Sequence, residues 1–148
     1  MTIYFYTTKS EYGDFSNFAR YGIELDGLWW PTVEHYFQAQ KFPDNAEHKE
    51  SIRTAASPGI AKQLGRKKKI SRIQEWEQIK DSIMLTAVRK KFTTHPELRT
   101  LLLSTGTEKL VENAPNDYYW GCGQDGSGKN RLGTILMQVR AELKAANS

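Results

Sequence analysis

Residues 30–41 read WPTVEHYFQAQK, and at this point the sequence changes from strand-like to helical. Thr32 can cap a helix, which we expect to run to about Lys41. At about 100° per residue, one face of that helix is apolar and consists of Val33, Tyr36 and Phe37. The stripe beside it is polar and consists of Glu34, Gln38 and Lys41. A helix divided in this way packs its apolar side against a core.

Glu34 is the first candidate for chemistry, because it stands on the flank of the aromatic face. Partial burial there would raise the pKa of the carboxyl and make it fit for proton transfer near neutral pH. The alternative is an exposed ladder of Glu34, Gln38 and Lys41, in which each pair contributes a few tenths of a kcal/mol. The spacing alone favours the ladder.

The segments on either side of this helix predict a small β element and five more helices. Residues 3–7 are β-prone, and residues 22–30 predict a hairpin that turns at Asp26-Gly27. The other helices are expected over residues 45–55, 58–64, 74–92, 94–103 and 132–143. Ser57-Pro58 and a capping box at residues 94–97 mark two of their starts. We therefore predict one helix-rich α+β domain over residues 1–148, with a small N-terminal β element.

Composition fits an ordinary globular protein. The 148 residues are 39% hydrophobic and 26% charged, values that do not suit a disordered chain. No apolar run approaches the roughly 18 residues that a membrane helix requires, and the N-terminus lacks the basic region of a signal peptide. Cys122 is the only cysteine, which excludes an internal disulfide and suits a reducing cytoplasm. We expect a cytoplasmic protein with no membrane partner.

The net charge of +4 comes from one segment. Residues 62–72 carry six basic residues and no acid, so the rest of the chain has 15 basic and 17 acidic residues, a net charge of −2. Such a patch can attract phosphate or nucleic acid. The alternative is that Lys67, Lys68 and Lys69 form a solvated loop between helices.

A second candidate region is glycine-rich. Residues 116–133 read NDYYWGCGQDGSGKNRLG and lead into the C-terminal helix. A glycine-rich backbone can approach a ligand closely, and free N–H groups at the helix start would favour a phosphate. Lys129 and Arg131 add positive charge, and Trp120 with its tyrosine neighbours could stack on a base. The alternative is a flexible loop with a helix cap at Asn130.

Metal and cofactor chemistry are not expected. The chain has four candidate metal ligands of the histidine and cysteine type, namely His35, His48, His95 and Cys122. No two of them stand at the close spacing that is typical of a metal site. The glycine spacing matches neither a Walker loop nor a dinucleotide fingerprint. We therefore expect neither a metal nor a cofactor.

Three motifs together resemble the NADAR family. They are DFSNF at residues 14–18, WPTVEHYFQAQKF at residues 30–42, and the stretch from WG at residues 120–121 to NRLG at residues 130–133. The likeness extends over about residues 3–140. It implies a compact, mostly helical YbiA-like fold and N-glycosidase activity. One departure is Cys122, which stands where the family leads us to expect an aspartate, so that Asp125 would have to substitute.

The resemblance implies a substrate class and a set of site residues. YbiA-like members of the family act on phosphoribosylamino-pyrimidine intermediates of riboflavin biosynthesis, and other members remove ADP-ribose from guanine in DNA. Cleavage of either ribose–nitrogen bond passes through an oxocarbenium-like state, a problem that glycoside hydrolases solve with two carboxylates. The residues carried over as catalytic are Glu34, Asp117 and Trp76. The expected substrate-binding residues are Asn17, Lys41, Trp120, Gly121, Gly123, Lys129, Asn130 and Arg131.

Within this hypothesis Glu34 is the acid/base group and Asp117 the second carboxylate. Trp76 would pack against the base or the sugar, although its place on an amphipathic helix equally suits a core position. The expected partner is a small phosphoribosyl substrate, and the rival is ADP-ribosylated DNA held by residues 62–72. Two non-catalytic alternatives are a module that binds ADP-ribose or a nucleotide, and a nucleic-acid-binding protein built on the basic patch.

Overall fold

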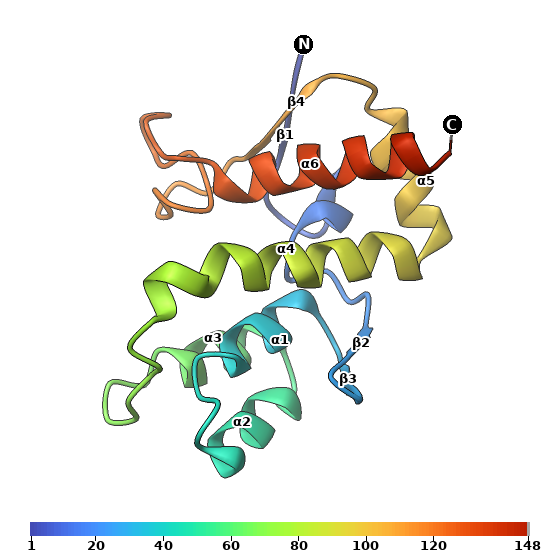
Figure 1. The fold of residues 1–148 in the computed structure, drawn as a ribbon. Helices are drawn as coiled ribbons and strands as arrows, with labels where there is room; N and C mark the ends of the chain where they lie inside the picture. Colours follow the sequence, from blue (N-terminus) through green and yellow to red (C-terminus); the bar gives the residue numbers. More distant parts are fainter. Residues whose placement is uncertain (148) are drawn as a thin grey trace. The chain divides into compact units, whose positions relative to one another are not determined.

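The computed structural model describes residues 1–147, which contain six α-helices and four short strands (Figure 1). The chain forms two compact units, which are described separately. The inserted unit consists of Arg20–Lys91, and the terminal unit consists of Met1–Ala19 together with the chain from Phe92 onward.

The inserted unit begins with the predicted hairpin. Strands β2 (Ile23–Leu25) and β3 (Leu28–Trp30) pair antiparallel, with Ile23 opposite Trp30. The two turn residues, Asp26 and Gly27, both have positive φ angles, of 58° and 78°. A two-residue turn of this kind matches the twist of the strands, which is why an Asp-Gly pair forms it readily.

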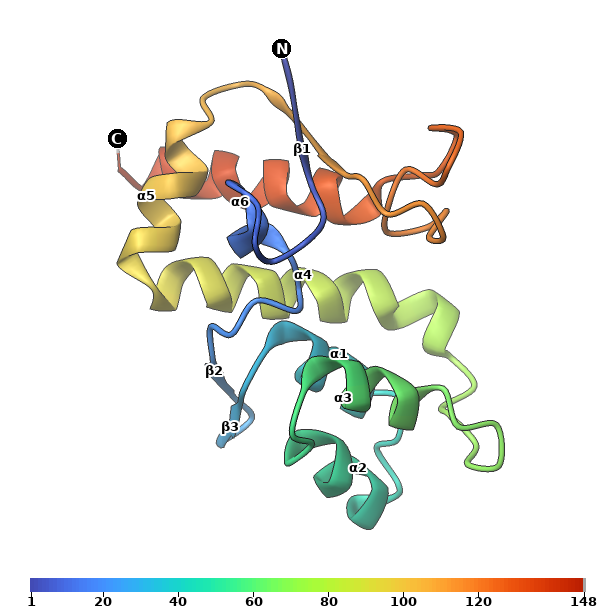
Figure 2. The same ribbon diagram turned by 180° about the vertical axis from the view of Figure 1, so that it is seen from behind.

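Three capped helices follow the hairpin, as predicted. They are α1 (Val33–Ala39), α2 (Ala46–Arg53) and α3 (Pro58–Gly65), and they lie side by side in both Figure 1 and Figure 2. Their cap residues are Thr32, Asn45 and Ser57, whose side-chain oxygens accept backbone N–H bonds of 3.2, 3.0 and 3.1 Å. These bonds satisfy donors that a helix start otherwise leaves without a partner.

Helix α4 (Trp76–Thr94) is the longest element, close to the predicted 74–92. It begins in the inserted unit, and its last three residues belong to the terminal unit. Met84, Ala87 and Val88 are fully buried, which confirms the amphipathic period predicted for this helix.

The terminal unit contains a two-stranded parallel sheet. Strand β1 (Thr2–Phe5), which overlaps the predicted β-prone residues 3–7, pairs with β4 (Lys109–Glu112), a strand that the sequence did not predict, and Thr2 lies opposite Lys109. A short 3₁₀ turn, Gly13–Phe15, follows β1. Burial of Leu110 and Val111 anchors β4 in this sheet.

Two more helices complete the terminal unit, α5 (Pro96–Ser104) and α6 (Arg131–Ala146). The predicted capping box is wrong, because Thr94 ends α4 and His95 caps α5 without a side-chain bond. Proline at the first position of α5 leaves His95 extended, as a residue before proline prefers. The apolar side of α6 is buried as predicted, through Leu132, Ile135, Leu136, Val139 and Leu143.

The predominantly helical α+β fold is thereby confirmed. No helix within residues 1–147 has the length and apolar character needed to cross a bilayer. That the whole chain acts as one domain stays a prediction.

Candidate active site

Glu34 is buried inside the inserted unit. Its side chain lies in the first turn of α1, and the residue is 7% exposed. Oε2 of the carboxylate accepts a hydrogen bond of 2.7 Å from Nε2 of Gln38, one turn further along the helix. Burial raises the pKa of Glu34, and the bond from Gln38 opposes that rise. The expectation of a buried carboxyl with a raised pKa is therefore confirmed, and the exposed ladder is wrong.

Three cations act on this carboxyl. Lys62 and Arg66 stand one turn apart on and just after α3, and Lys41 follows the end of α1. Their positive charges lower the pKa of Glu34 and so oppose the effect of burial. Attraction across a partly desolvated interior is stronger than in water. The site is thus a buried carboxyl set among cations, an environment that suits an anionic substrate.

Lys41 is itself buried, with 8% of the residue exposed. Its Nζ lies 5.7 Å from the ring centre of Trp76 and 6.0 Å from that of Phe37. Burial lowers the pKa of Lys41 to about 8, although the charge of Glu34 acts in the opposite direction. The resemblance implies that Lys41 is a substrate-binding residue, a role in which a lysine would neutralise a phosphate. A buried ammonium with a pKa close to neutrality is better suited to exchanging a proton.

Trp76 packs beside Lys41 and Phe37. The residue is 2% exposed, and its ring centre lies 5.0 Å from that of Phe37 at an interplanar angle of 59°. The inserted unit therefore brings together Glu34, Lys41 and Trp76, three of the residues singled out in the sequence.

An open pocket of about 630 Å³ has a lining that begins at Phe42, the residue after Lys41 in the sequence. Residues 42–45 and 69–75 line it. The backbone N–H of Ile73 donates a 2.7 Å bond to the carbonyl of Lys41, which fastens the second of these segments to the end of α1. The lining includes the cations Lys69 and Arg72.

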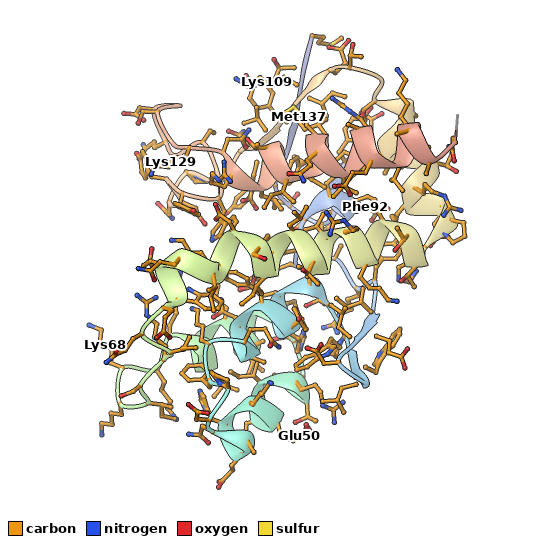
Figure 3. All side chains as sticks on the ribbon, viewed as in Figure 1. Glu50, Lys68, Phe92, Lys109, Lys129 and Met137 are labelled. Carbon is orange, nitrogen blue, oxygen red and sulfur yellow. The ribbon has the colours of Figure 1, made fainter. Side chains whose placement is uncertain are left out.

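The basic segment at residues 62–72 is mostly solvated. Lys67, Lys68 and Lys69 are exposed in the loop between α3 and α4, and Lys68 extends outward in Figure 3. This confirms the solvated-loop alternative for the three lysines. Arg72 is also exposed and pairs with Glu77 at 3.3 Å.

Asp117 belongs to the terminal unit, where it shapes a turn. Its Oδ1 accepts hydrogen bonds from the backbone N–H groups of Tyr119 (3.0 Å) and Trp120 (2.8 Å). One carboxylate oxygen of Asp117, the expected second carboxylate, is therefore engaged in fixing the backbone of this turn. Asn17 of the same unit is buried, and the side chains of Trp120 and Arg131 are half-buried.

The backbone N–H groups that lead into α6 donate hydrogen bonds within the glycine-rich segment itself. Those of residues 129–132 donate in turn to the carbonyls of residues 118, 121, 119 and 120, over 2.9 to 3.1 Å. The expectation of free N–H groups at the start of α6 is therefore wrong for these residues. Gly123 makes room for a neighbour within the segment, since a side chain there would overlap the Tyr118 ring. Lys129 is exposed, as Figure 3 shows, with its Nζ 5.5 Å from the Tyr119 ring centre.

Asn130 ties this segment to the sheet. It is buried, and its backbone is left-handed with φ of 53°. Its Oδ1 accepts from the N–H of Glu112 and its Nδ2 donates to the carbonyl of Leu110, both over 2.9 Å. Asn130 occupies the N-cap position of α6, as the helix-cap alternative predicted, but its side chain makes no capping hydrogen bond. Asn130 instead fixes the position of the loop.

Cys122 and Asp125 differ in exposure. Cys122 is buried, and its Sγ donates to Oδ1 of Asn113 over 3.4 Å. Asp125 is exposed and accepts hydrogen bonds from the N–H and hydroxyl of Ser127. Within residues 1–147 no cluster of three or more His, Cys, Asp or Glu side chains could hold a metal ion.

Gln38, Lys62 and Arg66 were not among the predicted site residues, although Gln38 stood in the polar stripe and the two cations in the basic segment at residues 62–72. A signal for each was present in the spacing, since Gln38 stands four residues after Glu34 and the two cations are four residues apart. Helical neighbours at this spacing share a face.

The chain resembles known proteins over nearly its whole length. The NADAR domain profile matches residues 4–144. The N-glycosidase YbiA of Escherichia coli strain K12 is 52% identical over 141 residues, which are 95% of this chain and 88% of that protein. The NMR structure of E. coli YbiA has a TM-score of 0.91 at 49% identity, covering 99% of this chain and 86% of that one.

A more distant relative has a longer chain. The chloroplastic riboflavin biosynthesis protein PYRR of Zea mays is 40% identical over 155 residues, which cover 95% of this chain and 25% of that protein. Because the profile and the bacterial relatives span almost all of this sequence, the chain belongs to the NADAR domain family.

Proposed function

We propose that the chain hydrolyses the ribose–nitrogen bond of phosphoribosylamino-pyrimidine intermediates of riboflavin biosynthesis. The broader activity follows from the family: the chain is an N-glycosidase, a hydrolase of N-glycosyl bonds. A non-catalytic binding module is therefore set aside. The choice of substrate is supported by relatives named as riboflavin biosynthesis proteins.

The observation that carries the proposal is the buried pair of Glu34 and Lys41 among further cations. Hydrolysis breaks the bond between the anomeric carbon and the nitrogen, and the oxygen of water bonds to that carbon. One proton must leave the water and one must reach the departing nitrogen. We assign the first transfer to the Glu34 carboxylate and the second to the Lys41 ammonium, after which the proton on Glu34 restores Lys41.

Burial favours the uncharged form of both groups. It raises the pKa of Glu34 and lowers that of Lys41 to about 8, which brings the two pKa values closer to each other and eases the exchange of a proton between the groups. The Glu34 carboxylate also stabilises the positive charge that develops on the ribose. Opposite changes of pKa in two neighbouring groups are a common basis for acid and base roles.

The cations near Glu34 are the candidates for holding a phosphate. Lys62 and Arg66 already act on Glu34, and Lys69 and Arg72 line the neighbouring pocket together with the acids Asp44 and Glu75. We propose that some of these cations receive the phosphate in place of Lys41.

Several sequence predictions remain proposals. Trp76 is proposed to shape the site through its contact with Lys41. In the terminal unit, Asp117 remains the proposed second carboxylate. The proposed substrate-binding residues there are Asn17, Trp120, Gly121, Gly123, Lys129, Asn130 and Arg131. We place the reaction in the cytoplasm, where a chain with one cysteine is expected to work.

The test is a product assay by mass spectrometry without added metal, on the ribosylamino-pyrimidine phosphates. We expect Glu34→Gln to lower kcat by about a hundredfold or more, the usual contribution of a positioned acid or base. Glu47→Gln, which changes an exposed carboxyl on α2, is the matched control and should leave the rate unchanged. Full turnover by folded Glu34→Gln would contradict the assigned role.

A second candidate is hydrolysis of ADP-ribosylated guanine in DNA. The exposure of Lys67, Lys68 and Lys69 favours it, since solvated cations attract a DNA backbone. Turnover of a DNA substrate should then fall steeply with salt and with a triple change of these lysines to Gln. Turnover of the small substrate should not respond to the triple change.

A further inference from the structure

We propose that Gln38 is a positioning residue for Glu34, and that Gly65 provides the space in which the Gln38 amide is held. The inference rests on the proposed role of Glu34 and extends it to two residues that do not touch the reacting atoms.

The first observation is the hydrogen bond itself. Gln38 is 4% exposed and Glu34 is 7% exposed, so their bond of 2.7 Å lies away from solvent. An N–H group that donates to a carboxylate stabilises the ionised form. It also fixes which oxygen of Glu34 remains for other partners, because Oε2 is the atom that accepts.

The second observation is the other end of the same amide. Among the described residues, Oε1 of Gln38 is buried and has no hydrogen-bond partner. A buried acceptor without a partner is costly, and native proteins contain few of them. Here the donor end serves Glu34, and the acceptor end receives no compensation from the protein.

The third observation explains what keeps the amide in place. A Cβ atom at Gly65 would overlap Oε1 of Gln38 and would lie 2.7 Å from its Cδ. The amide therefore packs directly on the α-carbon of Gly65, the last residue of α3. Any side chain at position 65 would push Gln38 out of its place.

Other groups set the charge around Glu34. On the side of α3 they are Lys62 and Arg66, and at the end of α1 it is Lys41. His48 of α2 is engaged elsewhere, with its Nε2 2.9 Å from the carbonyl oxygen of Leu64. Gln38 is distinct from the cations because its effect depends on direction and contact, whereas theirs acts over a distance.

The direct test measures the pKa of Glu34 by carbon NMR of its carboxyl in the protein without substrate. Gln38→Leu removes the donor at nearly constant volume, and we expect the pKa of Glu34 to rise by about one to two pH units. The acidic limb of the pH profile of kcat/KM should move upward by the same amount. Gln40→Leu is the matched control, since Gln40 lies on the same stretch and no bond joins it to Glu34; it should move neither value.

Substitution of Gly65 provides a second, independent test of the inference. Gly65→Ala should displace the amide and reproduce the rise in the pKa of Glu34, whereas Gly59→Ala, on the same helix and in open space, should not. Because both changes break one contact, the double variant Gln38→Leu/Gly65→Ala should shift the pKa no further than Gln38→Leu alone. Should Gly65→Ala fail to fold, Gln38→Leu still decides the question.

An unchanged pKa of Glu34 in Gln38→Leu overturns the inference. Additive shifts in the double variant would also overturn the part assigned to Gly65. Failure of the proposed function has a different signature, namely full turnover by Glu34→Gln, and the NMR titration does not depend on any substrate.

Discussion

Replacement of Lys41 by methionine should make the protein more stable and less active. The lysine is charged at pH 7 although it is buried beside Trp76 and Phe37. Methionine fills a similar volume without a charge that needs solvation. The burial of Lys41 lowers the stability of the protein, yet the lysine is present in the site. Such a residue is typical of a site in which stability is lost in favour of activity.

The magnitude follows from the pKa of Lys41, which burial lowers from 10.5 to about 8. This difference corresponds to about 3 kcal/mol of destabilisation at pH 7, at about 1.4 kcal/mol per pH unit. The attraction to Glu34 is already contained in the folded pKa, so methionine forfeits in addition only the ring contacts, worth about 0.5–1 kcal/mol. We therefore expect a net gain of about 2 kcal/mol in the free energy of unfolding, or about 4–8 °C in Tm.

The pH dependence gives this prediction its sign. Because the folded pKa is the lower one, the unfolded chain binds the proton more tightly, and the cost of charging Lys41 is complete below about pH 8. It shrinks as the pH rises from about 8 toward 10.5 and disappears only above 10.5, where the lysine is neutral in both states. The advantage of Lys41→Met should therefore shrink by about 2 kcal/mol between pH 7 and pH 10.

The assay is urea unfolding of both proteins at pH 7 and pH 10, with Lys68→Met as the control. Lys68 is exposed, so its replacement should change stability by less than about 0.5 kcal/mol. A variant Lys41→Met that is less stable than the wild type at pH 7, or whose gain is equal at both pH values, refutes the reasoning. Turnover should fall sharply in Lys41→Met and stay unchanged in Lys68→Met.

Two further predictions concern the contact of α6 with β4, and both are measured by urea unfolding. Asn130→Ala removes the partners of the Leu110 carbonyl and the Glu112 N–H, so it should cost about 2–4 kcal/mol; Asn130→Asp, which keeps one acceptor, should cost less. Gly133→Ala should cost about 2 kcal/mol or more, because its methyl would overlap the Leu110 carbonyl oxygen, whereas Gly59→Ala should be neutral or stabilising. Equal stability of wild type and Asn130→Ala, or of Gly133→Ala and Gly59→Ala, would contradict these accounts.

Local signals were enough to predict the helices of the inserted unit. Thr32, Asn45 and Ser57 each cap the helix that follows, and each bond spans only three residues. Strand β4 could not be predicted from local signals, because its four residues pair with β1 at the other end of the sequence, with Lys109 opposite Thr2. Short strands depend on such distant partners rather than on their own composition.

The same distinction holds for the site. The position of Glu34 beside an aromatic face predicted its burial. The burial of Lys41 was missed, because Trp76 of α4 contributes to it and no local pattern joins the two residues. The expectation of free N–H groups at the start of α6 failed for a related reason. The carbonyls of Tyr118, Tyr119 and Trp120 reach the N–H groups of the α6 start only through the fold of the loop.

The parallel pairing of β1 with β4 has a consequence for the order of folding during synthesis. Thr2 is synthesised before the inserted unit, and its partner Lys109 only after the whole of that unit has been made. Contacts among α1, α2 and α3 join residues close in sequence, so they can form while the chain is still growing. The β1 segment, with the exposed Tyr4 and Tyr6 in and beside it, stays unpaired while the inserted unit is made.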